Sequence, residues 1–172
     1  PDWLKFFGHM VKRDSKGVAT AIYYPETEND KVTGFKIRSL PKRFSKVGRT
    51  GKSSQLSGQF RYRSNNKRIA YVGGENDKVA VWGSLRKYDV HVVSPTTGEG
   101  SAADQAAMQY EFFDRYDEIY VGMDGDEKGF EANENIAKVL PADKVKIIRW
   151  SDNDPHKLLE NDRSHQIVRD FF

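Results

Sequence analysis

Acidic side chains follow three apolar runs of this 172-residue chain, at the points where the runs end. They are Glu75, Asp124, Asp126, Asp152 and Asp154. Carboxylates that lie close together repel one another unless a cation sits between them. Oxygen ligands with open positions suit Mg²⁺ or Mn²⁺, which keep water molecules and recruit phosphate oxygens. The motifs therefore predict a site in which one ion activates an attacking hydroxyl and a second steadies a leaving pyrophosphate.

Basic side chains are concentrated in the first 70 residues, which carry 16 basic and 5 acidic groups, a net charge of +11. Residues 71–172 carry a net charge of −8. Aromatic residues such as Phe44 and Tyr62 are interleaved with the basic ones, and this combination can neutralise phosphates and stack on unpaired bases. The basic residues are Lys42, Arg43, Lys46, Arg49, Lys52, Arg61 and Arg63. A solvated loop is the alternative reading of this segment.

Composition excludes several classes of function. The chain has no Cys, which rules out disulfides, cysteine zinc sites, iron–sulfur clusters and thiol catalysis. Its four His residues are scattered without zinc-ligand spacing, so we expect no zinc in this chain. No apolar run approaches the roughly 18 residues of a membrane helix, and no membrane partner is expected. The chain begins with Pro1 rather than Met, so we expect a piece of a longer protein.

The first 67 residues read as a small basic α+β subdomain. Residues 18–24 and 32–38 are strand-like and flank a cluster of turn residues at 25–30, which predicts a hairpin. Residues 40–59 are rich in Lys, Arg, Ser and Gly with few apolar side chains, so we expect a long functional loop there.

Residues 68–172 alternate between strand and helix. Apolar runs at 69–72, 90–93, 118–123 and 145–149 predict four strands. Helical patterns follow at 76–87, at 101–114 with a Ser101–Asp104 capping box, at 127–140, and after Asp154. Alternation of this kind predicts an α/β fold with a mostly parallel four-stranded sheet covered on both faces.

Ligands of such sheets bind beyond the carboxyl ends of the strands, where the acidic motifs lie. A simpler reading of Asp124 and Asp126 is turn and helix-capping chemistry. Acidic residues after three separate strands favour the metal site over that reading.

Several motifs of the chain resemble the TOPRIM fold, which is shared by primases, topoisomerases and some nucleases. The closer resemblance, over residues 20–162, is to the RNA polymerase domain of the primase–helicases of T-odd bacteriophages. The motifs are Gly-Glu-Asn-Asp at 74–77, Met-Asp-Gly-Asp-Glu-Lys-Gly at 123–129 and Asn-Asp-Pro-His-Lys-Leu-Leu at 153–159, with supporting stretches at 32–48, 110–116 and 139–145.

The resemblance implies a DNA primase, a nucleotidyltransferase that makes short RNA primers from ribonucleoside triphosphates on a single-stranded DNA template. Asp124 and Asp126 then resemble the metal-binding pair, and Asp154 the later acidic position with Asp152 as a helper. The residues that resemble nucleotide and phosphate contacts are Asp77, Lys42, Arg38 and Lys46. The resemblance also implies a zinc-binding domain and a replicative helicase outside this chain, and a cytoplasmic location in a host cell.

Position 73 departs from the family pattern. The family has a Glu before the glycine that ends the first strand of the parallel sheet, whereas this chain has Gly73 followed by Gly74 and Glu75. Glycine binds no metal and moves no proton. Three readings follow: Glu75 substitutes if the backbone stays extended through Gly74, the change inactivates the enzyme, or the domain retains nucleic-acid binding alone. A TOPRIM nuclease that uses the same acidic residues is a further alternative.

Overall fold

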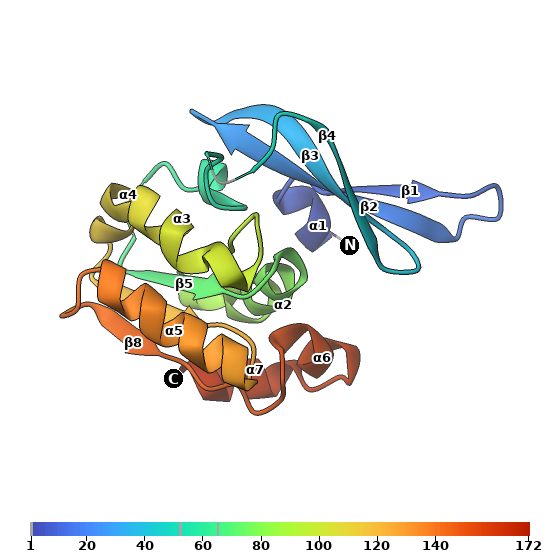
Figure 1. The fold of residues 1–172 in the computed structure, drawn as a ribbon. Helices are drawn as coiled ribbons and strands as arrows, with labels where there is room; N and C mark the ends of the chain where they lie inside the picture. Colours follow the sequence, from blue (N-terminus) through green and yellow to red (C-terminus); the bar gives the residue numbers. More distant parts are fainter. Residues whose placement is uncertain (1, 52, 65) are drawn as a thin grey trace.

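The described residues form two four-stranded sheets together with helices (Figure 1). The computed structural model describes residues 2–51, 53–64 and 66–172. No helix among the described residues is both long enough and apolar enough to cross a membrane. One sheet is antiparallel and the other parallel, so the expected α/β fold with an additional basic N-terminal part is confirmed.

The N-terminal part is an antiparallel sheet preceded by one short helix. Its strands follow one another in the order β1-β2-β3-β4. The predicted hairpin is present, and Asn29 and Asp30 form its turn with positive φ angles of 49° and 61°, a backbone region that Asn and Asp tolerate well. The elements are α1 (Asp2–Phe6), β1 (Met10–Arg13), β2 (Ala19–Glu28), β3 (Lys31–Ser39) and β4 (Arg43–Gly48).

Two predictions for this part were wrong. The antiparallel pairing of β2 with β3 continues through Pro25, which lies opposite Phe35. Residues 25–28 therefore belong to β2 rather than to a turn. The segment 40–59 is not all loop, because its residues 43–48 form β4 at the edge of the sheet. An edge strand with every residue exposed needs no apolar face, so its polar sequence gave no period-two signal.

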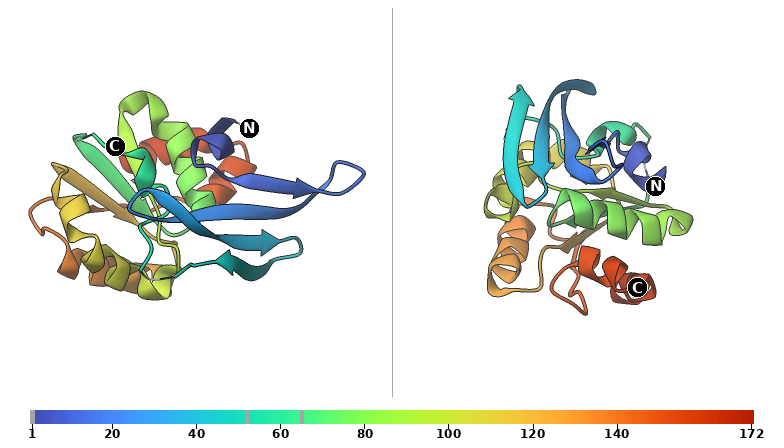
Figure 2. Two further views of the ribbon diagram at one scale, coloured as in Figure 1. Left: turned by 90° about the horizontal axis from the view of Figure 1, so that it is seen from above. Right: turned by 90° about the vertical axis from the view of Figure 1, so that its right-hand side faces the viewer.

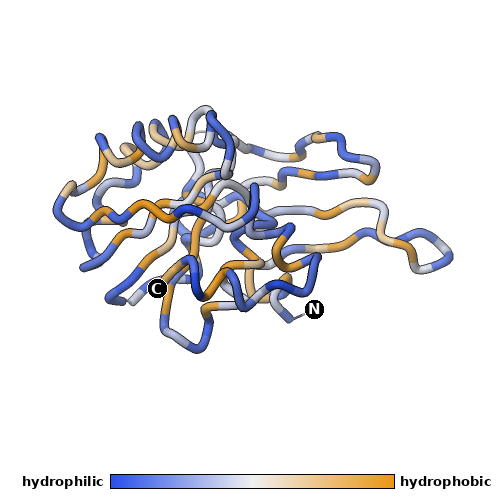
Figure 3. The backbone as a smooth tube through the Cα atoms, turned by 90° about the horizontal axis from the view of Figure 1, so that it is seen from below, coloured by the Kyte–Doolittle hydropathy of each residue, from blue (hydrophilic) through white to orange (hydrophobic). Residues whose placement is uncertain are grey.

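The four apolar runs form a parallel sheet, as predicted, and its strand order is β6-β5-β7-β8. Successive residues of β5 face opposite sides: Ile69 and Tyr71 join one hydrophobic cluster, and Ala70 and Val72 join the other. Figure 3 shows hydrophobic stretches along the interior strands and a hydrophilic tip on the hairpin that projects furthest. The strands are β5 (Arg68–Val72), β6 (Val90–Val93), β7 (Glu118–Gly122) and β8 (Val145–Ile147).

Helices cover both faces of the parallel sheet (Figure 2). One group packs together on one face and consists of α2 (Glu75–Leu85), α6 (Pro155–Glu160) and α7 (Ser164–Phe171). The other group consists of α3 (Ala102–Met108), α4 (Tyr110–Asp114) and α5 (Glu127–Val139).

The predicted helix at 101–114 is interrupted at Gln109, which separates α3 from α4. The predicted capping box is absent as well: Ser101 Oγ shares a hydrogen bond of 2.8 Å with Thr97 Oγ1 instead of capping α3. The Ser101 hydroxyl therefore bonds to the loop before α3, whereas the sequence pattern predicted that it would cap the helix.

The antiparallel sheet packs against the N-terminal end of α2. Tyr24 is buried, and its hydroxyl donates a hydrogen bond of 2.9 Å to Asn76 Oδ1. Lys78 is fully buried and donates to Ser57 Oγ at 2.7 Å, with His9 Nε2 at 3.4 Å. Burial lowers the pKa of Lys78 to about 7 and that of His9 to about 2. These contacts fix the position of the basic sheet relative to the carboxyl ends of the parallel strands.

Candidate active site

A cavity of about 480 Å³ lies between the basic sheet and the carboxyl edge of the parallel sheet. Its walls combine residues that are far apart in sequence: the sheet contributes from positions 24–44, and strand ends contribute from three places along the chain. The lining residues are Tyr24, Lys36, Arg38, Lys42, Phe44, Gly73, Gly74, Glu75, Asn76, Asp77, Thr96, Thr97, Gly98, Glu99 and Asp124. Five predicted site residues, namely Arg38, Lys42, Glu75, Asp77 and Asp124, are therefore brought together.

Glu75 reaches this cavity because Gly74 is extended, with φ −153° and ψ 175°. Its carboxylate is buried and forms an ion pair of 2.5 Å with Lys36 Nζ. The same ammonium donates to the carbonyl of Thr96 at 2.8 Å. Glu75 thus sits at the predicted edge, but its charge is already balanced by a lysine of the basic sheet.

Asp77 and Asp124 are carboxyls whose ionisation is disfavoured. Burial, followed by the charges of Asp124 and Asp154, raises the pKa of Asp77 to about 8. Burial, followed by the charges of Glu99, Asp154 and Asp126, raises the pKa of Asp124 to about 6. Strand ends from different parts of the chain therefore bring like charges together in a half-buried place, as the sequence predicted. Such a cluster favours the binding of a cation.

Glu99 belongs to the loop that follows β6, and sequence analysis did not select it. Its Oε1 accepts a hydrogen bond of 2.6 Å from the backbone N–H of Asp124. Burial and the charge of Asp126 raise the pKa of Glu99, while the bond from Asp124 opposes them. The only sequence signal for Glu99 is that it follows β6, the one strand of the parallel sheet whose end was not assigned an acidic residue.

Asp126 and Asp154 act as helix caps in this structure. Asp126 Oδ1 accepts from the N–H of Gly129 at 2.9 Å and begins α5. Asp154 Oδ1 accepts from the N–H of Lys157 at 2.7 Å and begins α6. Each carboxylate has a second oxygen, that of Asp154 lying 3.8 Å from Lys157 Nζ, so capping and metal binding do not exclude each other.

Asp152 lies beside this group but makes other contacts. It accepts from the N–H of Asn153 at 2.8 Å and lies 3.4 Å from an Arg163 guanidinium nitrogen. It does not line the cavity.

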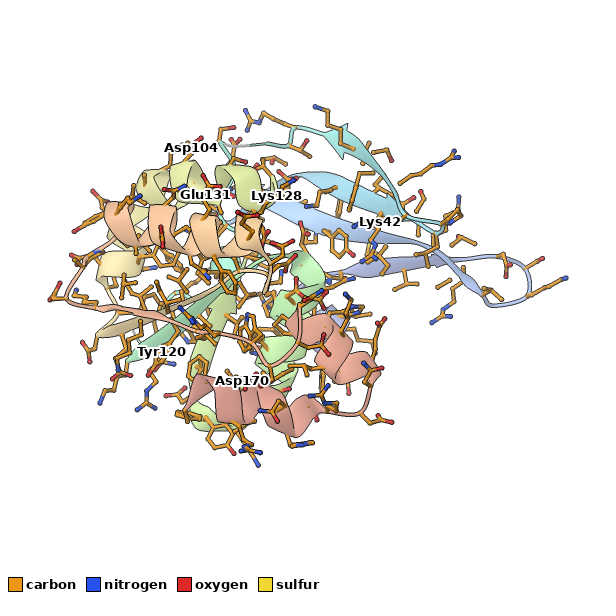
Figure 4. The ribbon with its side chains drawn as sticks, turned by 60° about the horizontal axis from the view of Figure 1, so that its bottom comes forward. Lys42, Asp104, Tyr120, Lys128, Glu131 and Asp170 are labelled. Atoms are coloured by element: carbon orange, nitrogen blue, oxygen red, sulfur yellow. The ribbon has the colours of Figure 1, made fainter. Side chains whose placement is uncertain are left out.

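One face of the antiparallel sheet forms the basic wall. Lys36 lies opposite Lys46, and Arg38 lies opposite Phe44, so the four side chains share a face. The Phe44 ring lies 5.6 Å from Lys36 Nζ and 5.9 Å from Lys42 Nζ. Figure 4 shows Lys42 on the antiparallel-sheet side of the molecule and Lys128 and Glu131 on α5. Lys36, two residues before Arg38 in the same strand, was missed although period-two spacing indicates it.

The remaining basic residues of the sequence prediction do not line this cavity. Lys46 shares the basic face but stays outside, and Arg43 lies on the other face of the sheet, opposite Ser39. Other contacts occupy Arg49, 2.6 Å from Glu28; Arg61, over the Phe6 ring; and Arg63, 3.7 Å from Asp30. Lys52 lies outside the described residues.

A larger cavity, of about 830 Å³, lies elsewhere between the loop after β4 and the helices α3 and α4. Its acidic lining residues are Asp30 and Glu111, and neither follows a strand of the parallel sheet. Arg63 and Arg115 also line this cavity, but it lacks the acidic residues at the ends of parallel strands that distinguish the smaller one, and we place the candidate active site in the smaller one.

The carboxylates fit a hard divalent cation in chemistry, although no group of three or more acidic or His side chains among residues 2–51, 53–64 and 66–172 is already gathered around one point. The fit rests on where their oxygens lie. A Cβ at Gly73 would lie only 2.8 Å from Glu99 Oε1 and 2.9 Å from Asp124 Oδ1, closer than a Cβ packs against another atom. The glycine therefore lets two carboxylate oxygens approach the same point, and oxygen ligands of this type suit Mg²⁺ or Mn²⁺.

The known proteins that are similar to this chain are primases. No protein-family profile matches the chain. The DNA helicase/primase of Enterobacteria phage T3 is 32% identical over 138 residues, which cover 80% of this chain and 24% of that protein. The chain thus spans about a quarter of the length of this relative.

Two solved structures have the same fold over almost the whole chain. The primase fragment of the bacteriophage T7 primase–helicase aligns with a TM-score of 0.88 and 26% identity, covering 99% of this chain and 70% of the fragment. The T7 primase domains solved with the lagging-strand DNA polymerase, an RNA/DNA hybrid and dTTP align with a TM-score of 0.86 and 26% identity, covering 98% and 84%. In sequence and in fold, this chain resembles the primase domains of the T7 and T3 primase–helicases.

Proposed function

We propose that this chain catalyses metal-dependent synthesis of short RNA primers from ribonucleoside triphosphates on single-stranded DNA. The observation that carries the proposal is the single cavity in which Asp124 and Asp77 face Arg38 and Lys42. A nucleoside triphosphate needs cations around its phosphates, and the reaction at its α-phosphate needs carboxylates that hold metal ions. Both requirements meet in this one place.

The basic wall suits the triphosphate and the template. Lys42 and Arg38 neutralise phosphate oxygens, and Asp77 faces the same nucleotide from the opposite wall. The exposed ring of Phe44 offers a surface for base stacking. The T7 primase domains, which have this fold, were solved with an RNA/DNA hybrid and dTTP, which supports nucleotide and nucleic-acid ligands of the same classes.

The acidic wall suits one or two Mg²⁺ or Mn²⁺ ions. The residues that would hold them are Asp124, Asp126 and Asp154, with Asp152 and Glu75 nearby. A divalent ion bound here supplies a lowered pKa for the attacking hydroxyl and neutralises the triphosphate. In the reaction the 3′-oxygen of the growing RNA bonds to the α-phosphorus, and the bond from that phosphorus to the departing pyrophosphate breaks.

The partners of the reaction lie partly outside this chain. We propose that residues 1–67 hold template and triphosphate as one subdomain, and that residues 68–172 hold the metal ions as the other. The name of the T3 relative joins a helicase to its primase. A helicase segment and a zinc-binding domain that recognises the template are therefore the neighbours we propose for the full-length protein.

Primer extension tests this function directly. The full 172-residue chain is incubated with single-stranded DNA, a short annealed RNA, ribonucleoside triphosphates and Mg²⁺ or Mn²⁺, and the length of the labelled RNA is measured. We expect extension that requires template and metal. Lys42→Met is expected to reduce it at least tenfold, whereas Lys31→Met, which changes an exposed lysine at the far end of β3, leaves it unchanged.

Two other results would overturn the proposal. Salt-sensitive DNA binding without extension would identify a domain that binds nucleic acid alone, the alternative that Gly73 favours. Metal-dependent cleavage of DNA by the chain in the absence of nucleotides would identify a nuclease.

A further inference from the structure

Gly73 and Glu99 occupy complementary places at the edge of the parallel sheet. The direction in which a side chain at position 73 would extend leads between two carboxylates, 2.8 Å from Glu99 Oε1 and 2.9 Å from Asp124 Oδ1. No φ of the left-handed region is recorded at Gly73, so the backbone conformation does not exclude a side chain, but a Cβ would overlap these two oxygens unless the carboxylates moved. The space that a residue at position 73 would use is therefore reached by Glu99 from the neighbouring strand end.

The loop after β6 holds Glu99 in this position. Gly98 has φ 86°, a conformation that glycine adopts readily, and Glu99 then starts a short 3₁₀ turn before α3. The backbone N–H of Asp124 donates to Glu99 Oε1 at 2.6 Å. This bond ties the loop to the end of β7 and orients the carboxylate toward Asp124 and the cavity.

No basic group balances the charge of Glu99 among residues 2–51, 53–64 and 66–172. Lys128 of α5, labelled in Figure 4, lines a second cavity with Glu99, and Lys42 lines the candidate active site with it, but neither forms an ion pair with it. Glu99 Oε2 accepts no hydrogen bond from these residues either. A half-buried carboxylate next to Asp124, without a cationic partner among the described residues, is unfavourable unless a cation from solution binds there.

We propose that Glu99 supplies the metal-binding carboxylate that position 73 lacks, and that it holds a divalent cation together with Asp124. This inference rests on the proposed function, and it changes which residues carry that function. Glu75, the substitute nearest in sequence, is already paired with Lys36. Glu99 follows β6, whereas position 73 follows β5. The site thus has a carboxylate from the end of a different strand in place of the one that position 73 lacks.

The first experiment measures Mn²⁺ binding by the full chain, with isothermal titration calorimetry or electron paramagnetic resonance of free Mn²⁺. Glu99→Gln keeps an oxygen that can accept from the N–H of Asp124 and removes only the charge. We expect its Mn²⁺ affinity to fall at least about tenfold. Glu134→Gln, which removes an exposed carboxylate from α5, is the matched control and should bind as the unchanged chain does. Equal Mn²⁺ affinity of Glu99→Gln and the unchanged chain overturns the inference.

The second experiment moves the carboxylate. Gly73→Glu by itself places a new acidic side chain against Glu99 and Asp124, so we expect no gain in Mn²⁺ affinity. Gly73→Glu combined with Glu99→Ala should recover most of the affinity that Glu99→Ala alone loses. If the double variant binds Mn²⁺ no better than Glu99→Ala, the two positions do not share one ligand place and the inference is wrong.

Primer extension with the same variants separates this inference from the proposed function. If Mn²⁺ affinity depends on Glu99 but the unchanged chain extends no primer, the cation site stands and the polymerase function is wrong. If the unchanged chain extends primers and Glu99→Gln both binds Mn²⁺ and extends equally well, the polymerase function stands and the role of Glu99 is wrong.

Discussion

Lys36 and Glu75 connect the two sheets through one buried ion pair of 2.5 Å. Lys36 comes from the middle of β3, and Glu75 opens α2 directly after β5. The lysine also donates to the carbonyl of Thr96 in the loop after β6. One ammonium therefore joins β3 to two other segments that form the wall of the candidate active site, and its loss tests how that wall is held.

Lys36→Met is expected to lower the free energy of unfolding by about 3 kcal/mol, because Glu75 is left buried without its partner. Urea denaturation followed by circular dichroism measures this change. Lys46→Met is the matched control, since Lys46 lies directly opposite Lys36 on β4 but is exposed, and it should change stability by less than about 0.5 kcal/mol. Equal effects of the two substitutions would show that the ion pair of Lys36 with Glu75 does not contribute to the free energy of unfolding.

Asp124→Asn should stabilise the chain in the absence of metal and remove stabilisation by metal. The pKa of Asp124 is raised to about 6, so the charged carboxylate is unfavourable in the folded state above that pH. Replacement by a neutral amide should raise the free energy of unfolding by about 1 kcal/mol at pH 8, after allowance for solvent screening, and by much less at pH 3.5, where the carboxyl is largely protonated in both states.

Thermal unfolding with and without Mn²⁺ measures both effects of Asp124→Asn. The unchanged chain should gain melting temperature with Mn²⁺, because a ligand that binds only the folded state stabilises it. A variant that keeps this gain would show that Asp124 is not a metal ligand.

Phe44→Ala should weaken the binding of single-stranded DNA or nucleotide without affecting the fold. The Phe44 side chain is 56% exposed and faces the cavity between two lysines. Loss of one stacking surface costs about 1–3 kcal/mol, so affinity measured by fluorescence anisotropy should fall about fivefold or more. Val47→Ala removes another exposed apolar side chain of β4, from the opposite face of the sheet, and should leave affinity unchanged. A loss shared by both variants would indicate a general effect on the edge strand.

His9 makes stability depend on pH. Burial, assisted by the charge of Lys78, lowers the pKa of His9 to about 2, whereas in the unfolded chain it is near 6.5. Below pH 6.5 the unfolded chain binds a proton that the folded chain does not bind. The histidine should therefore lower the free energy of unfolding by up to about 1.4 kcal/mol for each pH unit between 6 and 4.

Comparison of the unchanged chain with His9→Gln isolates this contribution, because other titrating groups are common to both. Urea denaturation at several pH values should show a flatter profile for the variant. Parallel profiles would mean that His9 is protonated in the folded protein.

The sequence by itself determined the parallel sheet and the acidic edge. Val, Ile and aromatic runs of four to six residues separated by helical patterns leave few arrangements other than a sheet covered on both faces, and strand ends then place Asp124 and Asp154 together. The polar edge strand at 43–48 was not predicted, because a strand that buries neither face shows no alternation of apolar and polar residues.

Tertiary structure alone decided which charges meet. Arg43, Arg49 and Arg63 are indistinguishable from Lys42 by composition, yet sheet register and local ion pairs direct them elsewhere. Lys36 and Glu99 enter the site because β3 and the loop after β6 approach the same edge, a relation that depends on long-range packing. The sequence shows that Gly73 lacks a carboxylate, and only the folded chain shows that Glu99 reaches the place a side chain there would fill.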